Sequence, residues 1–130
     1  MLATSKELLL KAQEGGYAVG AFNVENMEMV QAVLAAAEEL NSPVIMQTTP
    51  STVKYAGLDY YLANVEAAAK RTKVPVVMHL DHGNSFELAM QAYRTGYTSI
   101  MIDGSHESFE DNIVVSKAVA DACAPSGIPV

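Results

Sequence analysis

VVMHLDHG, at residues 76–83, is the stretch of sequence that decides the fold. An apolar, largely β-branched run begins after Pro75 and ends in a His-x-Asp-His motif followed by glycine. Apolar runs of this length between proline and glycine are typical of fully buried strands in parallel sheets. Open α/β sheets and α/β barrels carry their chemistry at the C-terminal ends of such strands. The stretch therefore predicts a buried parallel strand with two imidazoles and a carboxylate at its functional end.

A second apolar run with the same kind of ending follows further along the chain. Ser99–Ile102 is followed at once by Asp103, and His106 comes three residues later. Parallel strands that are neighbours in a sheet end at the same edge, so we expect these groups near His79, Asp81 and His82. Two strand ends that both carry acid and imidazole predict a metal or acid–base site at one mouth of the sheet.

Each of these side chains also has a plain structural interpretation, which stays open at this point. His79 fits a buried, hydrogen-bonded core histidine, and His82 fits a loop residue. Asp103 fits a cap for the turn that Gly104 and Ser105 begin. His106, next to Glu107, fits a solvated loop histidine.

Polar residues also lie at the ends of the first two strands of the pattern. Asn23 is placed to hydrogen-bond a substrate or to cap the residues after it. Thr48, Thr49 and Ser51 offer hydroxyls and free amides that suit a phosphate, although Thr-Pro-Ser is also common turn chemistry.

Strand and helix signals alternate along the whole chain. Helix starts carry Ser or Asn caps, and helix ends carry glycine or proline. The expected helices are Ser5–Glu14, Asn26–Leu40, Leu58–Lys70, Phe86–Arg94 and Ser108–Ala122, and the expected strands are Ala18–Val24, Val44–Met46, Val76–His82 and Ser99–Asp103, with a loop at 48–51. An N-terminal helix followed by four strand–helix units predicts an α/β fold with a parallel sheet and right-handed crossovers.

The last three residues repeat an opening seen twice before. Ile128-Pro129-Val130 resembles the Pro-then-apolar starts at Pro43-Val44 and Pro75-Val76. We interpret it as the beginning of a fifth strand, so that residues 1–130 form a single domain that is half of an eight-stranded barrel. A complete small α/β domain with a frayed tail is the alternative.

Composition narrows the function classes. Half of the 130 residues are apolar and 18% are charged, which argues against disorder. A net charge of −7 without a run of Lys or Arg argues against nucleic-acid and anionic-membrane partners. The single cysteine, Cys123, has no internal disulfide partner and fits a buried helix position. We expect a cytoplasmic protein without a membrane span.

Four motifs, taken together, resemble one known family. They are GAFN at 20–23, SPVI at 42–45, HLDH at 79–82 and MIDGSH at 101–106. In this order and over the whole chain they closely resemble the class II, metal-dependent ketose-bisphosphate aldolases, which include the fructose- and tagatose-bisphosphate enzymes. The resemblance implies a TIM (β/α)8 barrel, of which this chain would be the N-terminal half.

The resemblance also implies an activity. The family reversibly cleaves a ketose 1,6-bisphosphate to dihydroxyacetone phosphate and glyceraldehyde 3-phosphate, a step of glycolysis. Zn2+ polarises the ketone, so no Schiff-base lysine is needed. By resemblance, Asp81 is the catalytic residue that moves the proton of the C4 hydroxyl, and His82 is a zinc ligand. His79 and Asp103 orient the metal and its ligands, and Asp103 is also suited to a second metal site. Asn23 and Thr49 bind the substrate and its phosphate.

The rest of the family's site lies beyond these residues. Two further histidine ligands, a glutamate and the main phosphate loops come from the second half of the barrel, and a catalytic zinc takes about three protein ligands. We therefore expect the isolated chain to be inactive. Because its sheet edges and apolar strand faces are exposed, we also expect it to form a homo-oligomer or to fold poorly. Two other functions stay open: a non-catalytic barrel subunit that supports an aldolase, and an α/β metal hydrolase that uses His79, Asp81, Asp103 and His106.

Overall fold

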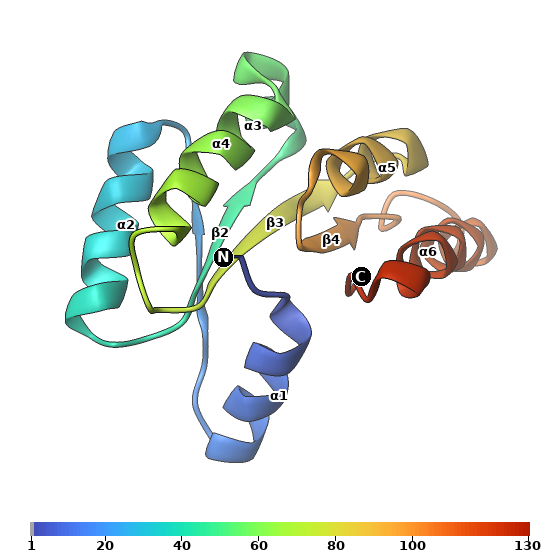
Figure 1. The fold of residues 1–130 in the computed structure, drawn as a ribbon. Helices are drawn as coiled ribbons and strands as arrows, with labels where there is room; N and C mark the ends of the chain where they lie inside the picture. Colours follow the sequence, from blue (N-terminus) through green and yellow to red (C-terminus); the bar gives the residue numbers. More distant parts are fainter. Residues whose placement is uncertain (1) are drawn as a thin grey trace.

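A computed structural model describes residues 2–130 as a parallel four-stranded sheet flanked by helices (Figure 1). Each strand is followed by at least one helix, as the sequence predicts. The elements are α1 (Ser5–Gly15), β1 (Gly20–Asn23), α2 (Met27–Glu39), β2 (Val44–Thr48), α3 (Pro50–Ala56), α4 (Leu58–Ala69), β3 (Val76–Gly83), α5 (Phe86–Thr95), β4 (Ser99–Ile102), α6 (Phe109–Cys123) and a short 3-10 helix, η1 (Ala124–Ser126).

The strands lie in the sheet in the order in which they occur in the sequence, β1-β2-β3-β4, and all three pairings are parallel. Helices α2, α4, α5 and α6 follow one another around one side of the sheet, whereas α1 lies by itself near the other end of the strands (Figure 1). This arrangement confirms the predicted α/β architecture of an N-terminal helix and four strand–helix units.

The two faces of the sheet bury different residues because side chains alternate along a strand. Met46 and Met78 belong to the large core between the sheet and the outer helices. Their neighbours Ile45 and Val77 face the other way and pack against Leu8 of α1. The first helix therefore closes the face opposite the outer helices, at the end where the strands begin.

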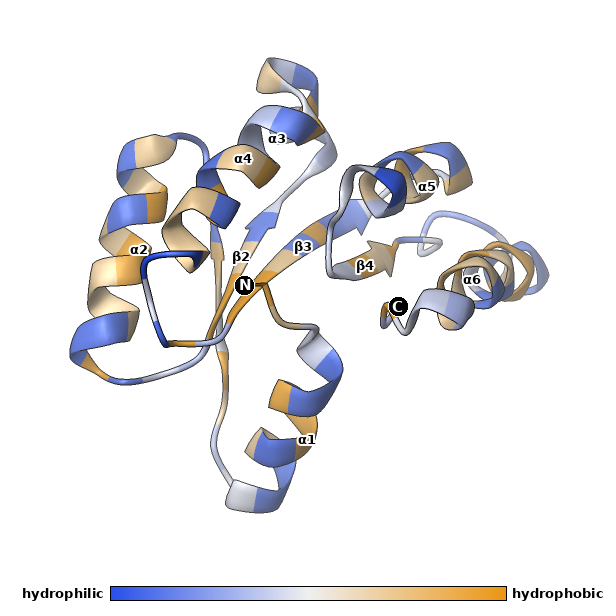
Figure 2. Ribbon diagram, viewed as in Figure 1, coloured by the Kyte–Doolittle hydropathy of each residue, from blue (hydrophilic) through white to orange (hydrophobic). Residues whose placement is uncertain are grey.

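Polarity changes along the central strands. Figure 2 shows β2 and β3 hydrophobic where they begin and hydrophilic where they end. In β3 the change falls between Val76–Met78, which are fully buried, and His82, which is exposed. The C-terminal edge of the sheet is thus the place where polar side chains gather, as expected for a functional end.

Two local predictions were wrong. The first strand spans only Gly20–Asn23, shorter than the expected 18–24. The expected loop at 48–51 instead completes β2 at Thr48 and begins helix α3. Thr49 is the N-cap of α3 and its side chain accepts a hydrogen bond from Thr52 N, while Pro50 occupies the first helical position, where its missing N–H costs nothing.

The end of the chain runs beside β4. Pro129 O accepts a hydrogen bond from Ile100 N at 3.0 Å. That Ile128–Val130 begin a fifth strand remains a prediction.

Cys123 is fully buried, as expected. Within residues 2–130, no helix combines the length and the apolar character that crossing a membrane requires.

Tyr97 and Thr48 provide a test of the outer core. Their hydroxyl oxygens lie 2.9 Å apart, and both residues are almost completely buried. We expect Tyr97→Phe to lower the free energy of unfolding by about 1–3 kcal/mol, because the Thr48 hydroxyl is left without its partner. Adding Thr48→Val should recover part of that loss, since both polar groups are then gone.

Urea denaturation followed by circular dichroism measures both effects. Tyr60→Phe is the matched control, because Tyr60 is 69% exposed and its substitution should leave stability nearly unchanged. A double variant that loses the full sum of the two single losses would contradict this account of the pair.

Candidate functional site

A bulge at the end of β3 sets the position of His82. The register with β4 shifts between Leu80, which faces Ile100, and Gly83, which faces Ile102, so β3 has one more residue here than β4. His82 takes up the extra residue with a φ of 52°, a left-handed conformation that is uncommon for a residue with a side chain. The backbone therefore turns at His82 itself, one residue before Gly83.

Gly83 is required by close packing. A Cβ at this position would lie 2.5 Å from Met101 O, so any larger residue would push β3 and β4 apart. The Gly83 carbonyl also accepts a hydrogen bond from Asp103 N at 2.7 Å. The glycine thus holds the ends of the two strands together, one residue after His82.

His82 and Asp103 form a hydrogen-bonded pair across these strand ends. His82 Nδ1 lies 2.6 Å from Asp103 Oδ2, and because a carboxylate only accepts, the ring nitrogen donates. Asp103 Oδ1 accepts from Ser105 N at 3.0 Å. Asp103 therefore closes the turn, which was its plain structural interpretation, and also orients His82.

The contact between His82 and Asp103 shifts the pKa values of both side chains. The hydrogen bond to Asp103 and the nearby charge of Asp81 raise the pKa of His82 above its ordinary value. Hydrogen bonds from Ser105 and His82 hold the pKa of Asp103 well below its usual range. The carboxylate is therefore ionised at neutral pH and fixes the ring with Nε2 turned away from it.

Asp81 lies on the other side of His82 and belongs to a polar row across three strands. Asp81 Oδ1 is 3.9 Å from His82 Nε2. Its other oxygen, Oδ2, accepts a hydrogen bond at 2.8 Å from Gln47 Nε2, which also donates to Asn23 Oδ1 at 2.7 Å. The side-chain amide of Gln47 on β2 thus links Asn23 on β1 to Asp81 on β3.

Gln47 was not among the residues predicted from the sequence. It follows the apolar run Val44–Met46 and lies opposite Asn23 on one side and His79 on the other. The sequence signal that could have found Gln47 is a polar side chain directly after an apolar run, on the same face of the strand as Ile45. Only the register of β1, β2 and β3 shows that this residue reaches Asp81.

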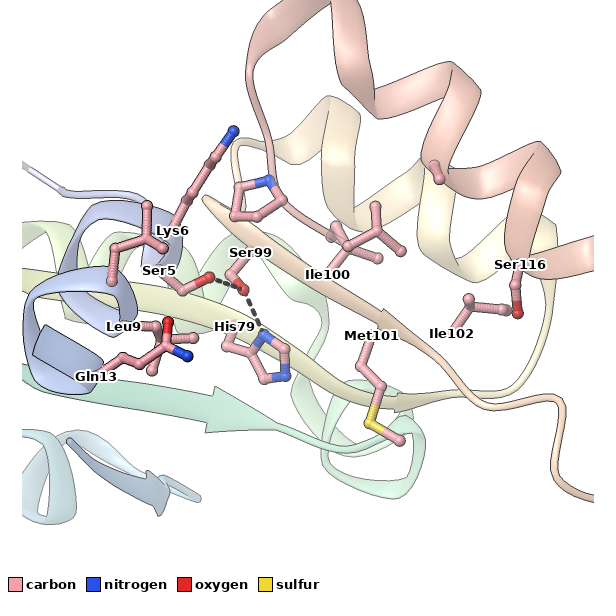
Figure 3. Close-up of a pocket in the computed structure, with 14 residues that line it drawn as sticks. Ser5, Lys6, Leu9, Gln13, His79, Ser99, Ile100, Met101, Ile102 and Ser116 are labelled. Carbon is pink, nitrogen blue, oxygen red and sulfur yellow. Dashed lines mark hydrogen bonds between the residues drawn. The ribbon is translucent and has the colours of Figure 1, made fainter. Parts of the chain in front are cut away.

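His79 occupies a deeper layer below Asp81. Its Nδ1 lies 2.8 Å from Ser99 Oγ, and Ser99 Oγ lies 2.8 Å from Ser5 Oγ of α1 (Figure 3). Burial lowers the pKa of His79, against the opposing influence of the Asp81 charge. His79 is therefore a buried, hydrogen-bonded histidine that connects the first helix with the layer beneath the site.

The other two candidates lie apart from this group. The Thr49 hydroxyl is engaged with the hydroxyls of Ser51 and Thr52 at the start of α3. His106 is exposed in the turn after β4, and it makes no hydrogen bond or ion pair within residues 2–130. The four-residue cluster that a metal hydrolase would need is therefore not assembled.

The donors present fit one part of a zinc site. His82 offers Nε2 while its Nδ1 is held by a carboxylate, which is the usual support of a metal-ligating histidine. The side chains of Asp81 and Asp103 are only 17% and 16% exposed, so both carboxylates are held in place. Within the described residues, however, no group of three or more His, Cys, Asp or Glu is arranged to hold a metal ion.

Comparisons with known proteins all identify the same family of aldolases. The family model described as "Fructose-bisphosphate aldolase class-II" matches residues 3–130. The fructose-bisphosphate aldolase of Thermus caldophilus is 48% identical over 130 residues, which are 100% of this chain and 42% of that protein. That of Helicobacter pylori (strain ATCC 700392 / 26695) is 42% identical over 131 residues, which are 100% of this chain and 43% of that protein.

Solved structures give the same result. The YdjI aldolase from Escherichia coli K12 superposes with a TM-score of 0.94 at 38% identity, over 100% of this chain and 50% of that one. A putative fructose-1,6-bisphosphate aldolase from Coccidioides immitis gives 0.85 at 32% identity, over 94% and 48%. These neighbours have the TIM-barrel fold, and the chain spans about half the length of the relatives it matches.

The burial of His79 predicts a pH dependence of stability. Because its pKa is lower in the folded chain than the ordinary 6.5, the unfolded chain binds the proton first. The free energy of unfolding should therefore fall as the pH drops through 6.5 and keep falling until His79 is protonated in the folded state. His79→Asn should remove this part of the pH dependence.

Urea denaturation at a series of pH values between about 7.5 and about 5.5, around the ordinary histidine pKa, measures the effect. The difference between the unsubstituted chain and His79→Asn isolates His79 from His82, whose raised pKa acts in the opposite direction. His106→Asn is the control and should keep the original slope. Three parallel pH profiles would refute the assignment.

Proposed function

Since this chain belongs to the class II fructose-bisphosphate aldolase family, we propose that it supplies the N-terminal half of a zinc-dependent aldolase. The reaction is the reversible cleavage of a ketose 1,6-bisphosphate to dihydroxyacetone phosphate and glyceraldehyde 3-phosphate. The observation that carries the proposal is His82, held by Asp103 and lying beside Asp81, at the C-terminal edge of a parallel sheet. The isolated chain, with one imidazole ligand, should not cleave the sugar.

In this proposal Asp81 is the acid–base residue. During cleavage it accepts the proton of the C4 hydroxyl, and during condensation it returns that proton. Gln47 supports the role because its Nε2–H bond occupies Asp81 Oδ2 and fixes the carboxylate, which leaves Oδ1 on the side of His82. A carboxylate held by one donor keeps a constant direction toward the substrate.

His82 would hold the zinc ion through Nε2. Asp103 keeps the ring in that orientation, and His79 fixes the layer below through Ser99. Bound zinc supplies Lewis-acid polarisation of the substrate ketone. The remaining protein ligands would come from outside residues 1–130, in keeping with relatives about twice as long.

We propose Asn23 and Thr49 as substrate-binding residues on the family resemblance. Gln47 already binds the Asn23 carbonyl, so the Asn23 amide N–H groups remain for a substrate oxygen. The Thr49 hydroxyl would have to exchange its bonds to Ser51 and Thr52 for a phosphate oxygen. Fructose 1,6-bisphosphate is the favoured sugar, because the curated relatives carry that name.

The proposal includes a role in glycolysis and a cytoplasmic location, which go with phosphorylated sugar substrates. A subunit that only supports another aldolase would not need an acid–base carboxylate or a metal-ligating imidazole. Both Asp81 and His82 are present and oriented, and this favours the catalytic role.

A chimera tests the role of Asp81. Residues 1–130 replace the corresponding 42% of the Thermus caldophilus aldolase, and the chimera should cleave fructose 1,6-bisphosphate. In that chimera, Asp81→Asn should lower kcat by a factor of about 100 to 10,000, because the proton acceptor is lost, with a much smaller change in KM. Asp59→Asn, exposed on α4, is the matched control and should leave kcat unchanged. Full activity in a folded Asp81→Asn chimera would refute the assignment.

Metal content tests His82 separately. After dialysis the chimera should retain zinc, His82→Ala should lose most of it, and Asp103→Ala should lose part of it, because the ring is no longer held. His106→Ala should retain zinc. Calorimetric titration of the 130-residue chain by itself should show only weak binding of Zn2+. Tight, stoichiometric binding by the isolated chain that is insensitive to His82→Ala would argue against this ligand assignment.

A further inference from the structure

Four polar side chains form a continuous hydrogen-bonded set at the C-terminal edge of the sheet. Ser51 Oγ lies 2.9 Å from Thr49 Oγ1, which lies 3.1 Å from Thr52 Oγ1. Thr52 Oγ1 lies 2.8 Å from Glu25 Oε1. Glu25 follows β1, and the three hydroxyl residues come from the N-cap and the first turn of α3. We call these four residues the hydroxyl network, and it joins the segments that follow β1 and β2.

The carboxylate of Glu25 sets the direction of every side-chain bond in the hydroxyl network. A carboxylate only accepts, so Thr52 donates its single hydroxyl proton to Glu25 Oε1. Thr52 Oγ1 therefore accepts from Thr49, and this uses the only hydroxyl proton of Thr49. Thr49 Oγ1 in turn accepts from Ser51. All three protons thus point toward Glu25, and the open end at Ser51 Oγ offers only lone pairs.

Buried contacts hold the hydroxyl network in place. Thr52 is only 2% exposed, so its hydroxyl depends on partners within the protein. The hydroxyl of Tyr61, also 2% exposed, donates to the backbone carbonyl of Glu25 at 3.3 Å. Thr52 N donates to Thr49 Oγ1 at 3.5 Å, in keeping with Thr49 as a helix N-cap. The direction of the bonds is therefore built into the fold, although Glu25 itself is an exposed residue.

This direction opposes the binding of a phosphate by Thr49. The oxygens of a phosphate dianion only accept hydrogen bonds, so Thr49 has to donate its proton to them. In the observed network Thr49 donates that proton to Thr52. If Thr49 turns the proton toward a phosphate, the buried oxygen of Thr52 loses its donor. Each phosphate contact of Thr49 therefore costs one existing hydrogen bond.

We propose that Glu25 is a specificity-determining residue that acts on Thr49 through Thr52. The proposal rests on the proposed function, in which Thr49 contacts the phosphorylated substrate. Glu25 and Thr52 are positioning residues: they hold the proton of Thr49 and so weaken its contact with a phosphate. The open end of the network at Ser51 Oγ instead favours a substrate hydroxyl, which donates to its lone pairs.

Two substitutions release the proton of Thr49 by different routes. In Glu25→Gln, the amide N–H donates to Thr52, so Thr52 donates to Thr49 and the Thr49 proton is free for a phosphate. In Thr52→Val, Thr49 loses the acceptor of its proton, whereas the backbone N–H of residue 52 still caps α3. Both substitutions should therefore strengthen the binding of a phosphorylated substrate.

Two simpler roles of Glu25 give other results. If Glu25 only anchors α3, both substitutions loosen Thr49 and raise KM. If Glu25 only repels the phosphate by its charge, Glu25→Gln lowers KM, and Thr52→Val, which keeps the charge, does not.

The stability of the 130-residue chain tests the hydroxyl network without any activity. Glu25→Ala and Thr52→Val should each lower the midpoint of urea denaturation. The double variant should lose less than the sum of the two shifts, because both substitutions break the same bond. Glu28→Ala, on the exposed first turn of α2, is the matched control, and its shift should add to that of Thr52→Val. Additive shifts for Glu25→Ala and Thr52→Val would overturn the proposal.

Kinetics of the chimera with the Thermus caldophilus aldolase test the specificity role. Glu25→Gln and Thr52→Val should each lower KM for fructose 1,6-bisphosphate about fivefold, the effect of one neutral hydrogen bond, with kcat nearly unchanged. The double variant should lower KM no further, since either substitution alone frees the proton. Thr52→Ser keeps the hydroxyl and should keep the original KM. Glu28→Gln removes an equal charge nearby and is the control for simple repulsion.

The outcomes separate this proposal from the proposed function. An active chimera in which KM rises or stays constant in both variants would overturn the role of Glu25 and leave the aldolase function intact. A fall in KM with Glu25→Gln alone would also overturn it, in favour of charge repulsion. A folded chimera without any aldol cleavage would refute the proposed function and the specificity role together, even if the stability measurements confirm the hydroxyl network.

Discussion

The alternation of side chains along β3, and the single place where it breaks, governs the rest of the structure. Met78 and Leu80 point into the outer core, and Val77, His79 and Asp81 face the other side of the sheet. At His82 the backbone enters a left-handed conformation and the alternation stops. Without that break His82 would face the helices, on the side of Leu80, and could not reach Asp103.

The same strand gives its two histidines opposite properties. His79 is buried in a layer of hydroxyls, which disfavours its charged form. Only three positions further on, His82 is 59% exposed between two carboxylates, which favour its charged form. How deeply each ring is buried determines the direction in which its pKa shifts. The neighbouring helix and strand ends set that depth.

Much of this was predictable from the sequence, and the failures have physical reasons. The parallel sheet follows from the alternation of strands and helices, and the meeting of His82 with Asp103 follows because neighbouring parallel strands end at the same edge. Gln47 was missed because its role depends on register, and register is fixed by pairing between separate strands. Helix α3 was missed because Thr49-Pro50 suits both a turn and a helix start, and the sequence alone does not choose between them.

The hydrogen bond between Ser5 and Ser99 joins residues 94 positions apart and has a consequence for the order of folding. Helix α1 precedes β4 in the sequence, and its buried Ser5 hydroxyl gains its partner only when β4 is in place. Contacts of such long sequence separation form late, because the intervening chain has to be ordered first. During synthesis, Leu8 of α1 can therefore pack on β2 and β3 as soon as these strands are formed, whereas the bond from Ser5 forms only after the three strand–helix crossovers that precede β4 are complete.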